Sequence, residues 1–459
     1  MKRLITVLVA LALFAAACAS SNSSIDTAST QTQTEPADAT THETPTPTPT
    51  TAETPTPTTV AEPPVAACTV PDGTPGTSPT DQLVAGFSDI GFDLLRSQSV
   101  ESNAVLSPAS IGHALLMLRP AADDESGAAI DEALSLPEGL AAHEAWRQID
   151  QQILEANRTV PRGEPVNPVV TFADRIWPTQ LANLDQEWVD ILATYHRSDL
   201  EPIDISQPEA SRATINDWVG SQTQELIPEL LPPGSLGRDT SMVLTDALYF
   251  EASWQSWFSE DSGVFQLVDG TLVRTPTIEA SSPVWGTGSA WPALYAEGDG
   301  WVASSVPYDG EDFSMLLVVP DTGRFDEIRA GLCSEFISEV DDALTLEHYS
   351  IELPKWQSST AIDLAPWLDE IGAKPGAYPG VGSNSRLSQG YHGADIAVDE
   401  LGTVAAAATA LISIEVSAGR GRDFNLEIDR PFFYLIRHDD TGLVLFAGQV
   451  VDPRPEAAD

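Results

Sequence analysis

Lysine is the scarcest charged residue in this sequence: only Lys2, Lys355 and Lys374 occur among 459 residues. The chain carries 68 Asp and Glu against 22 Lys and Arg, so its formal net charge is −46 at pH 7. A nucleic-acid partner is excluded, because a polyanion gains nothing from a surface with so few cations. Only six of the acidic residues precede residue 68, so the negative charge belongs to the body of the chain.

The sequence also lacks the motifs of common hydrolases. It contains no G-x-S-x-G or Walker sequence, and His143-Glu144 lacks the second histidine of H-E-x-x-H. No serine lies three residues before Lys355 or Lys374, which excludes the S-x-x-K of penicillin-binding proteins. The seven histidines are scattered without the spacing of metal ligands. We therefore expect no catalytic residue, no metal and no cofactor, and we predict that the protein is not an enzyme.

The N-terminus has the pattern of an export signal. Lys2 and Arg3 precede an apolar run over residues 4–14, and three alanines lead to Cys18. The run is too short for an ordinary membrane span and predicts a signal peptide over residues 1–17. A cysteine directly after small residues resembles the lipobox of bacterial lipoproteins, which implies that Cys18 becomes the lipidated first residue. Plain secretion is the alternative, and both predict an exported protein.

Residues 18–75 are rich in Ser, Thr and Pro and include the run TPTPTPTT. Such a segment cannot bury enough apolar surface to fold, so we predict an extended stalk, followed by one domain over residues 76–453 and a short tail over 454–459. Export also permits disulfides, and Cys68 and Cys333 remain as a possible pair once Cys18 is lipidated. Separation in sequence does not decide whether they pair.

The body shows no internal repeat and no second linker. Residues 81–97 have apolar side chains at helical spacing, and residues 113–118 continue a second helix. Short apolar runs over 245–250, 302–307 and 313–319 predict buried strands, and residues 431–437 and 443–451 flank a turn at 439–442. Helices come early and strands late, so the predicted fold class is α+β.

One segment carries a mechanism. Residues 399–410 read DELGTVAAAATA, with a strand-like run before them and a β-favouring run, LISIEV, after them. Small side chains between such runs suit a segment that is exposed in one state and slides between two packed strands in another. Large or charged side chains would not fit there.

This segment resembles the proximal hinge of the serpin family, and further motifs of that family follow in the right order. The hinge residues are Glu400, Gly402, Thr403, Ala405, Ala406, Ala407, Ala408 and Thr409. The residues that match the shutter and breach regions are Ser107, Pro108, Ser110, Asp246, Trp254 and His392. The matching stretches are 103–111, 215–219, 223–224, 227–231, 243–258, 353–355, 429–433 and 446–453, so the resemblance covers about residues 78–453.

The resemblance implies a serpin fold with three β-sheets, about eight to nine helices and an exposed reactive-centre loop. It also implies a monomeric suicide inhibitor of serine proteases, whose loop is cleaved and inserts into the central sheet while the protease stays covalently bound. An uncharged residue at Thr403 favours inhibition, because a charge would block entry into the sheet. The alternative is a non-inhibitory binding or adhesion lipoprotein with the same fold.

Counting as in the family places the reactive bond fourteen residues after Gly402, between Val416 and Ser417. Val416 suggests an elastase-like protease with a small apolar pocket, and Arg420 is an alternative that would select trypsin-like enzymes. Inserted residues alternate, so Thr403, Ala405, Ala407, Thr409, Leu411 and Ser413 are expected to face inward. Asp246 stands where the family usually has Asn; facing His392, it either makes a charge-assisted hydrogen bond or, if isolated, costs stability when ionised.

Overall fold

The computed structural model describes residues 77–157, 168–198, 200–256, 258–281, 294–347, 349–373, 378–382, 390–404 and 424–454. The chain divides into the units Met1–Ala61 and Glu62–Asp459, and all described residues belong to the second. The predicted signal peptide and stalk therefore lie outside the described residues. Within the described part, no helix is long and apolar enough to span a membrane.

Nine α-helices occur in the described ranges. They are α1 Pro79–Ser97, α2 Pro108–Leu118, α3 Asp124–Ala133, α4 Ala141–Ala156, α5 Gln186–Ile191, α6 Pro208–Gln222, α7 Phe325–Ala330, α8 Ser334–Ala343 and α9 Ala365–Glu370. Two short helical turns, η1 Arg119–Ala121 and η2 Leu192–His196, follow α2 and α5. The first helix begins with a capping box between Ser78 and Asp81, and it confirms the predicted apolar helix.

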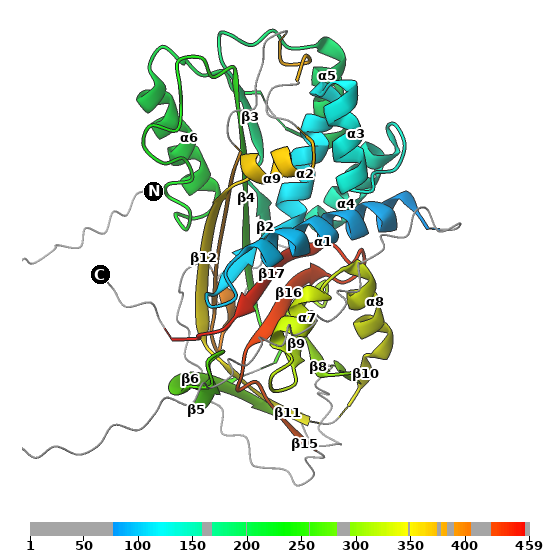
Figure 1. Ribbon diagram of the computed structural model, residues 1–459, viewed down its shortest axis with the longest axis vertical. Helices are drawn as coiled ribbons and strands as arrows, with labels where there is room; N and C mark the ends of the chain where they lie inside the picture. The colour runs from blue at the N-terminus through cyan, green and yellow to red at the C-terminus, as the bar shows by residue number, and fades with distance from the viewer. Residues whose placement is uncertain are drawn as a thin grey trace, which may run out of the picture. The chain divides into compact units, whose positions relative to one another are not determined.

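The strands form three sheets in this part of the chain (Figure 1). The seven-stranded sheet has the order β1 Ala104–Leu106, β17 Val444–Val450, β16 Phe432–His438, β9 Phe313–Pro320, β8 Trp301–Pro307, β7 Leu294–Gly298 and β10 Thr345–Leu346. The four-stranded sheet has the order β15 Phe424–Glu427, β11 Tyr349–Pro354, β6 Leu272–Ser281 and β5 Ser259–Gln266. The predicted hairpin is the antiparallel pair β16–β17.

The third sheet positions the candidate site. Its order is β12 Trp356–Asp363, β13 Tyr391–Val398, β14 Gly402–Val404, β4 Met242–Ser253 and β2 Val169–Phe172, and β3 Arg175–Pro178 also pairs with β4. Helices lie on both sides of β4 (Figure 1). Ile215 and Val219 of α6 pack in one apolar cluster with Val243 of β4, whereas Leu115 of α2 packs with Leu244 in the main core. Because successive side chains of β4 point to opposite faces of the sheet, β4 contributes residues to two separate apolar clusters.

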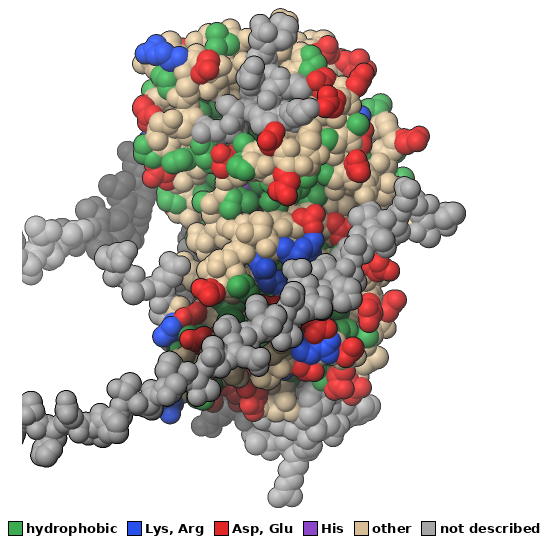
Figure 2. All heavy atoms as spheres, in the orientation of Figure 1, with side chains coloured by type: hydrophobic (Ala, Val, Ile, Leu, Met, Phe, Trp, Pro, Cys, Tyr) green, Lys and Arg blue, Asp and Glu red, His purple; other side chains and the backbone are tan. Residues whose placement is uncertain are grey.

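The predicted α+β class is confirmed, although strands β1, β2 and β3 lie among the early helices. The surface is strongly acidic, as the composition requires. On the face shown in Figure 2, Asp and Glu side chains are spread over the whole described surface, and Lys and Arg side chains are fewer. This distribution gives the body a broad negative field that no single cluster dominates.

Candidate functional site

The hinge segment, residues 399–404, lies partly inside the six-stranded sheet. Strand β14 pairs antiparallel with β4, where Thr403 lies opposite Ala252, and with β13, where Thr403 lies opposite Val398. Thr403, which the sequence assigns as the first residue to enter the sheet, is already in it and is only 2% exposed. The hinge thus occupies the first position between β4 and β13.

Gly402 makes this seating possible. A Cβ atom at this position would lie 2.0 Å from the carbonyl oxygen of Ala252, a distance that no side chain permits. The Asp399 side chain holds the turn before it, because its Oδ1 accepts hydrogen bonds from the backbone N–H groups of Leu401 at 2.8 Å and Gly402 at 3.3 Å. The glycine predicted from the motif therefore has a steric reason to be there.

The breach, at Trp254 and Tyr308, clamps the seated hinge. The indole N–H of Trp254 donates to the carbonyl oxygen of Asp399 at 2.8 Å, and its backbone N–H donates to that of Leu401 at 3.0 Å. Its ring stacks on Tyr308 at 4.6 Å between centroids. The hydroxyl groups of Tyr308 and Thr403 are 2.5 Å apart. Burial raises the pKa of Tyr308, so this hydroxyl keeps its proton for the bond.

Lys355 anchors the start of the hinge from outside the sheet. Its ammonium group lies 2.5 Å from carboxylate oxygens of both Glu400 and Glu260. Burial opposes ionisation of Glu400, but the ion pair with Lys355 holds the pKa of this carboxyl below its usual value. One of the three lysines in the sequence thus joins the hinge to the four-stranded sheet.

We call the boundary between β4 and β13 the seam. From the hinge toward the start of β4, the two strands first have no pairing with each other among the described residues and then pair directly. The two strands pair directly, in parallel, only where Tyr391, His392 and Gly393 lie opposite Thr245, Asp246 and Ala247. Residues 248–251 of β4 and 394–396 of β13 have no pairing with each other in the described structure. A longer β14 could therefore form backbone hydrogen bonds with both strands along this stretch, as far as the point where β4 and β13 pair directly.

The end of the seam where β4 and β13 pair directly is the predicted shutter. Ser107 begins α2, and its backbone N–H donates to Nε2 of His392 at 3.1 Å. Since Nε2 accepts, the imidazole proton is on Nδ1. Burial lowers the pKa of His392 to about 4, so the ring is neutral at pH 7. Ser110 donates its backbone N–H to the Ser107 hydroxyl and its own hydroxyl to Asp174. Pro108 occupies the first turn of the helix.

Asp246 and His392, which we call the shutter pair, face each other without a hydrogen bond. Oδ2 of Asp246 lies 3.6 Å from Nδ1 of His392. Both carboxyl oxygens and Nδ1 are buried with no hydrogen-bond partner among the described residues. Burial, followed by the charge of Asp174, raises the pKa of Asp246 well above its usual value. The charge-assisted hydrogen bond, one of the two alternatives left open by the sequence, is thus not formed in the described structure, and Asp246 is an isolated buried carboxyl.

A chain of buried histidines adjoins the shutter, which sequence reasoning missed. Nδ1 of His113 lies 2.5 Å from Oδ2 of Asp174, and Nε2 of His113 lies 3.0 Å from Nδ1 of His196. Nε2 of His196 in turn lies 2.8 Å from Nδ1 of His143. Burial lowers the pKa of His143 to about 4 and also lowers that of His196. The rings form a line and do not converge, and no group in the described residues could hold a metal ion. No sequence spacing links these residues, so only the fold brings them together.

Several predicted residues lie outside the described part of the chain. They are Ala405, Ala406, Ala407, Ala408 and Thr409 of the hinge, the reactive-bond candidates Val416, Ser417 and Arg420, and Cys18 and Cys68. Cys333 is buried at the start of α8 and forms no disulfide with another described residue. Because Cys68 is not described, the pairing of these two cysteines stays a prediction.

The comparisons with known proteins agree with this geometry. The family model described as "Serpin (serine protease inhibitor)" matches residues 85–453. Plasminogen activator inhibitor 1 of Sus scrofa is 28% identical over 385 residues, which are 80% of this chain and 91% of that protein. An uncharacterized serpin-like protein of Thermococcus kodakarensis is 26% identical over 384 residues, covering 81% of this chain and 86% of the relative.

Solved structures show the same fold. The native state of the thermophilic serpin tengpin aligns with a TM-score of 0.69 and 22% identity over 80% of this chain and 94% of tengpin. Uncleaved ovalbumin aligns with a TM-score of 0.68 and 22% identity over 82% of this chain and all of that chain. With the family model spanning the six-stranded sheet, the hinge and the shutter, this chain belongs to the serpin family, a family of serine protease inhibitors.

Proposed function

We propose that this protein inhibits serine proteases as a suicide substrate. The observation that carries the proposal is the position of the hinge. The uncharged Thr403 pairs with both β4 and β13, and the next described residues of these two strands do not pair with each other. A protease that cleaves the loop after Val416 would release a segment whose small side chains can continue β14. The cleaved protein would gain a fully paired sheet, and the protease would be trapped as its acyl-enzyme.

The proposed target is an elastase-like protease, because Val416 is a β-branched aliphatic residue at the expected reactive bond. Incubation of the protein with pancreatic elastase followed by a denaturing gel tests the function. A covalent adduct resistant to the denaturant supports inhibition, and clean cleavage without an adduct would reduce the protein to a substrate. Mass spectrometry of the released C-terminal peptide distinguishes cleavage at Val416 from cleavage at Arg420.

The second candidate function is that of a non-inhibitory binding protein on the same fold. The fold is compatible with it, because the solved complex of thyroxine-binding globulin with thyroxine aligns over 82% of this chain with a TM-score of 0.67 and 22% identity. No cleavage by a panel of serine proteases with small, basic and aromatic specificities would support this alternative over inhibition.

We also propose that the protein acts outside the cell, as a monomer tethered through a lipid on Cys18. The signal-like N-terminus and the Thr- and Pro-rich residues 18–75 support this proposal. Labelling of growing cells with an alkyne fatty acid tests it: the wild type takes up label and sediments with membranes. A Cys18→Ser variant that remained labelled would contradict lipidation at this residue.

A further inference from the structure

The buried histidine chain, formed by His113, His196 and His143, joins three helical elements end to end. His113 belongs to α2, His196 is the last residue of η2, and His143 belongs to α4. The rings contact each other at 3.0 Å and 2.8 Å, and the series ends on Asp174 between β2 and β3. All three histidines are at most 5% exposed. The proposed function uses none of these contacts.

The contact with Asp174 fixes the tautomer of every ring. A carboxylate only accepts hydrogen bonds, so Nδ1 of His113 donates and its Nε2 accepts. A neutral imidazole has one donor and one acceptor, so Nδ1 of His196 donates to His113, and Nδ1 of His143 donates to Nε2 of His196. Each neutral ring therefore carries its proton on Nδ1, and Nε2 of His143 is an acceptor at the end of the series.

This arrangement has a place for one further proton. When a proton binds Nε2 of His143, Nδ1 of that ring can pass its own proton to His196, and Nδ1 of His196 can pass its proton to His113. His113 then carries two protons and a positive charge, 2.5 Å from the carboxylate of Asp174. His196 and His143 are neutral again with their protons on Nε2, so no hydrogen bond between the rings is lost.

A second proton has no such place. Each contact between two rings holds one proton, and after the first step the outer nitrogen of His143 is also filled. A further proton puts two N–H groups opposite each other across 3.0 Å or 2.8 Å, so that hydrogen bond breaks. Burial, followed by the positive charges of Arg119 and His113, lowers the pKa of His143 to about 4, so this second step belongs to acid pH.

The charged groups around the buried histidine chain are mostly paired with one another. Arg119 of η1 and Asp131 of α3 form an ion pair at 2.5 Å, and Asp150 of α4 forms one with Arg197 at 3.1 Å. The titratable groups that face the three rings from the described elements are Arg119, Asp131, Asp150, Asp174, Tyr195, Arg197, Asp246 and His392.

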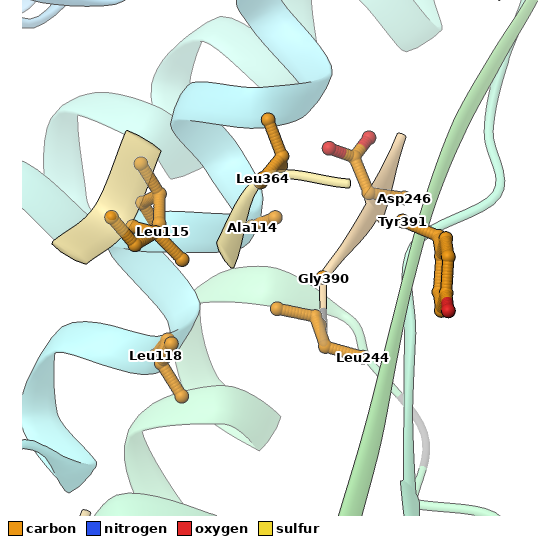
Figure 3. Close-up of a pocket in the computed structure, with 9 residues that line it drawn as sticks. Ala114, Leu115, Leu118, Leu244, Asp246, Leu364, Gly390 and Tyr391 are labelled. Atoms are coloured by element: carbon orange, nitrogen blue, oxygen red, sulfur yellow. The ribbon is translucent and has the colours of Figure 1, made fainter. Parts of the chain in front are cut away.

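Asp174 and Asp246 are the two carboxyls on the sheet side of the buried histidine chain. Asp246 lies beside apolar side chains of α2, β4 and α9 (Figure 3) and has no hydrogen-bond partner in the described structure. Its pKa is raised well above the usual value, chiefly by burial, so it is uncharged at pH 7. Asp174 is therefore the carboxylate that stabilises a positive charge on His113.

η2 is the element that the buried histidine chain holds in place. It is a single π-helical turn, Leu192–His196, followed by Arg197 with a φ of 48°, in the left-handed region that side chains disfavour. His196 uses one ring nitrogen on α2 and the other on α4. The ion pair of Arg197 with α4 involves a side chain that is 53% exposed, so water screens it. The hydrogen bond between His196 and His143 is thus the buried polar link between η2 and α4.

We propose that the buried histidine chain is a two-step acid switch for η2. The first proton passes through His143 and His196 to His113 and strengthens the contact between α2 and Asp174, while η2 stays in place. The second proton breaks the hydrogen bond between His196 and His143 and releases η2 from α4. The switch acts on the fold itself and does not depend on whether the protein inhibits proteases.

Nitrogen NMR of isotope-labelled histidine rings in the full chain tests the first step, because it distinguishes a proton on Nδ1 from one on Nε2. As the pH falls from about 8 to about 5, we expect His113 to become doubly protonated. His143 and His196 are expected to stay neutral and to change from the Nδ1–H form to the Nε2–H form. If both neutral rings keep the Nδ1–H form while His113 becomes charged, the transfer of protons along the rings is overturned.

His196→Gln interrupts the transfer of protons. An amide can hydrogen-bond to both neighbours but cannot pass a proton, so His143 is expected to keep its Nδ1–H form in this variant. His438→Gln is the matched control, because His438 is also buried with a lowered pKa, yet it bonds to Thr441 and lies outside the buried histidine chain. A change of tautomer at His143 in both variants would contradict the passage of the proton through His196.

Hydrogen exchange of the backbone amides of residues 192–197, corrected for the intrinsic effect of pH, tests the second step. Relative to the amides of α1, we expect wild type to lose at least about 10-fold in protection between about pH 5 and about pH 3.5. His143→Gln cannot take up the second proton and is expected to lose about 3-fold or less. Equal losses in the two proteins, or an equal loss in α1, would overturn the release of η2.

Asp150→Asn separates the switch from the ion pair beside it. The variant removes the charge that pairs with Arg197 and leaves all three rings in place. At pH 7 the amides of residues 192–197 are expected to keep their protection within about 3-fold, because both hydrogen bonds of His196 remain. A loss of about 10-fold in this variant at pH 7 would mean that the ion pair holds η2, and the switch would be overturned.

Discussion

The two ends of the seam between β4 and β13 differ in how well their polar groups are satisfied. At the breach, the hinge has its hydrogen bonds from Trp254, its ion pair with Lys355 and its contact with Tyr308. At the shutter, Asp246 and His392 are buried without a bond between them. The unfavourable free energy of burying polar groups without partners therefore lies at the shutter end of the seam and not at the breach end.

The largest effect is expected from a substitution that removes the hinge from the sheet at the breach end. Thr403→Arg places a charge in a site that is 2% exposed, so the hinge would leave the sheet and the cleaved loop would not insert. We expect at least about a 100-fold loss of covalent adduct, measured on denaturing gels, with cleavage retained. Leu401→Arg is the control, because Leu401 is exposed and should tolerate the charge. Full adduct formation by Thr403→Arg would exclude insertion from the mechanism.

The buried histidines next to the shutter predict that the free energy of unfolding falls at acid pH. Burial lowers the pKa of His143 to about 4, whereas the unfolded chain binds this proton near pH 6.5. Stability that is complete above about pH 6.5 is therefore lost as the pH falls toward 4, by about 1.4 kcal/mol per pH unit for this histidine. His143→Gln is expected to lose about 2 kcal/mol less than wild type between pH 7 and pH 5 in urea unfolding.

The control for this prediction is His42→Gln, because His42 belongs to the predicted stalk and should not change the pH dependence. Asp246 has the opposite effect on the pH dependence of stability. Because its pKa is raised, the native state keeps a proton that the unfolded chain has released, so this carboxyl favours folding as the pH falls. Parallel pH profiles for wild type and His143→Gln would show that the buried histidine chain does not titrate with unfolding.

Asp246 and Asp174 of the shutter region both have buried side chains but differ in their hydrogen bonds. Asp246 has no hydrogen-bond partner, whereas Asp174 accepts bonds from Ser110 and contacts His113. Asp246→Leu is expected to stabilise the uncleaved protein by about 1–3 kcal/mol, because it removes a buried carboxyl whose oxygens have no hydrogen-bond partner among the described residues. Asp174→Leu is expected to destabilise it by about 3 kcal/mol. Urea unfolding at pH 7 measures both, and a loss of stability in both variants would contradict the contrast.

The smallest effect is expected at the anchor of the hinge. Lys355→Ala removes a partly buried ammonium that pairs with Glu400 and Glu260, and we expect a loss of about 1 kcal/mol. Arg454→Ala is the matched control, because Arg454 is half exposed and its ion pair is with Asp452, two residues away. Equal effects of the two variants would mean that the ion pair at the hinge has no special weight.

The sequence was sufficient for the features that depend on local pattern. The motif from Glu400 to Thr403 predicted the hinge, and the family motifs predicted that Asp246 and His392 would face each other. It could not predict the contact of Tyr308 with Thr403, because the residues are 95 positions apart and tyrosine is common in cores. The line from Asp174 to His143 was missed for the same reason, since it joins α2, α4, η2 and the turn between β2 and β3, whose spacing in the sequence has no period. The loop and the export signal stay predictions from sequence.

The seated position of β14 has a further consequence for the kinetics of insertion. Adding a strand to a sheet has an unfavourable nucleation step, in which backbone entropy is lost before enough hydrogen bonds form to compensate. Here the first residues are already in register with both neighbours before any cleavage. Insertion would then proceed as propagation from an existing nucleus, and its rate would depend on how fast the seam opens rather than on a search for its beginning.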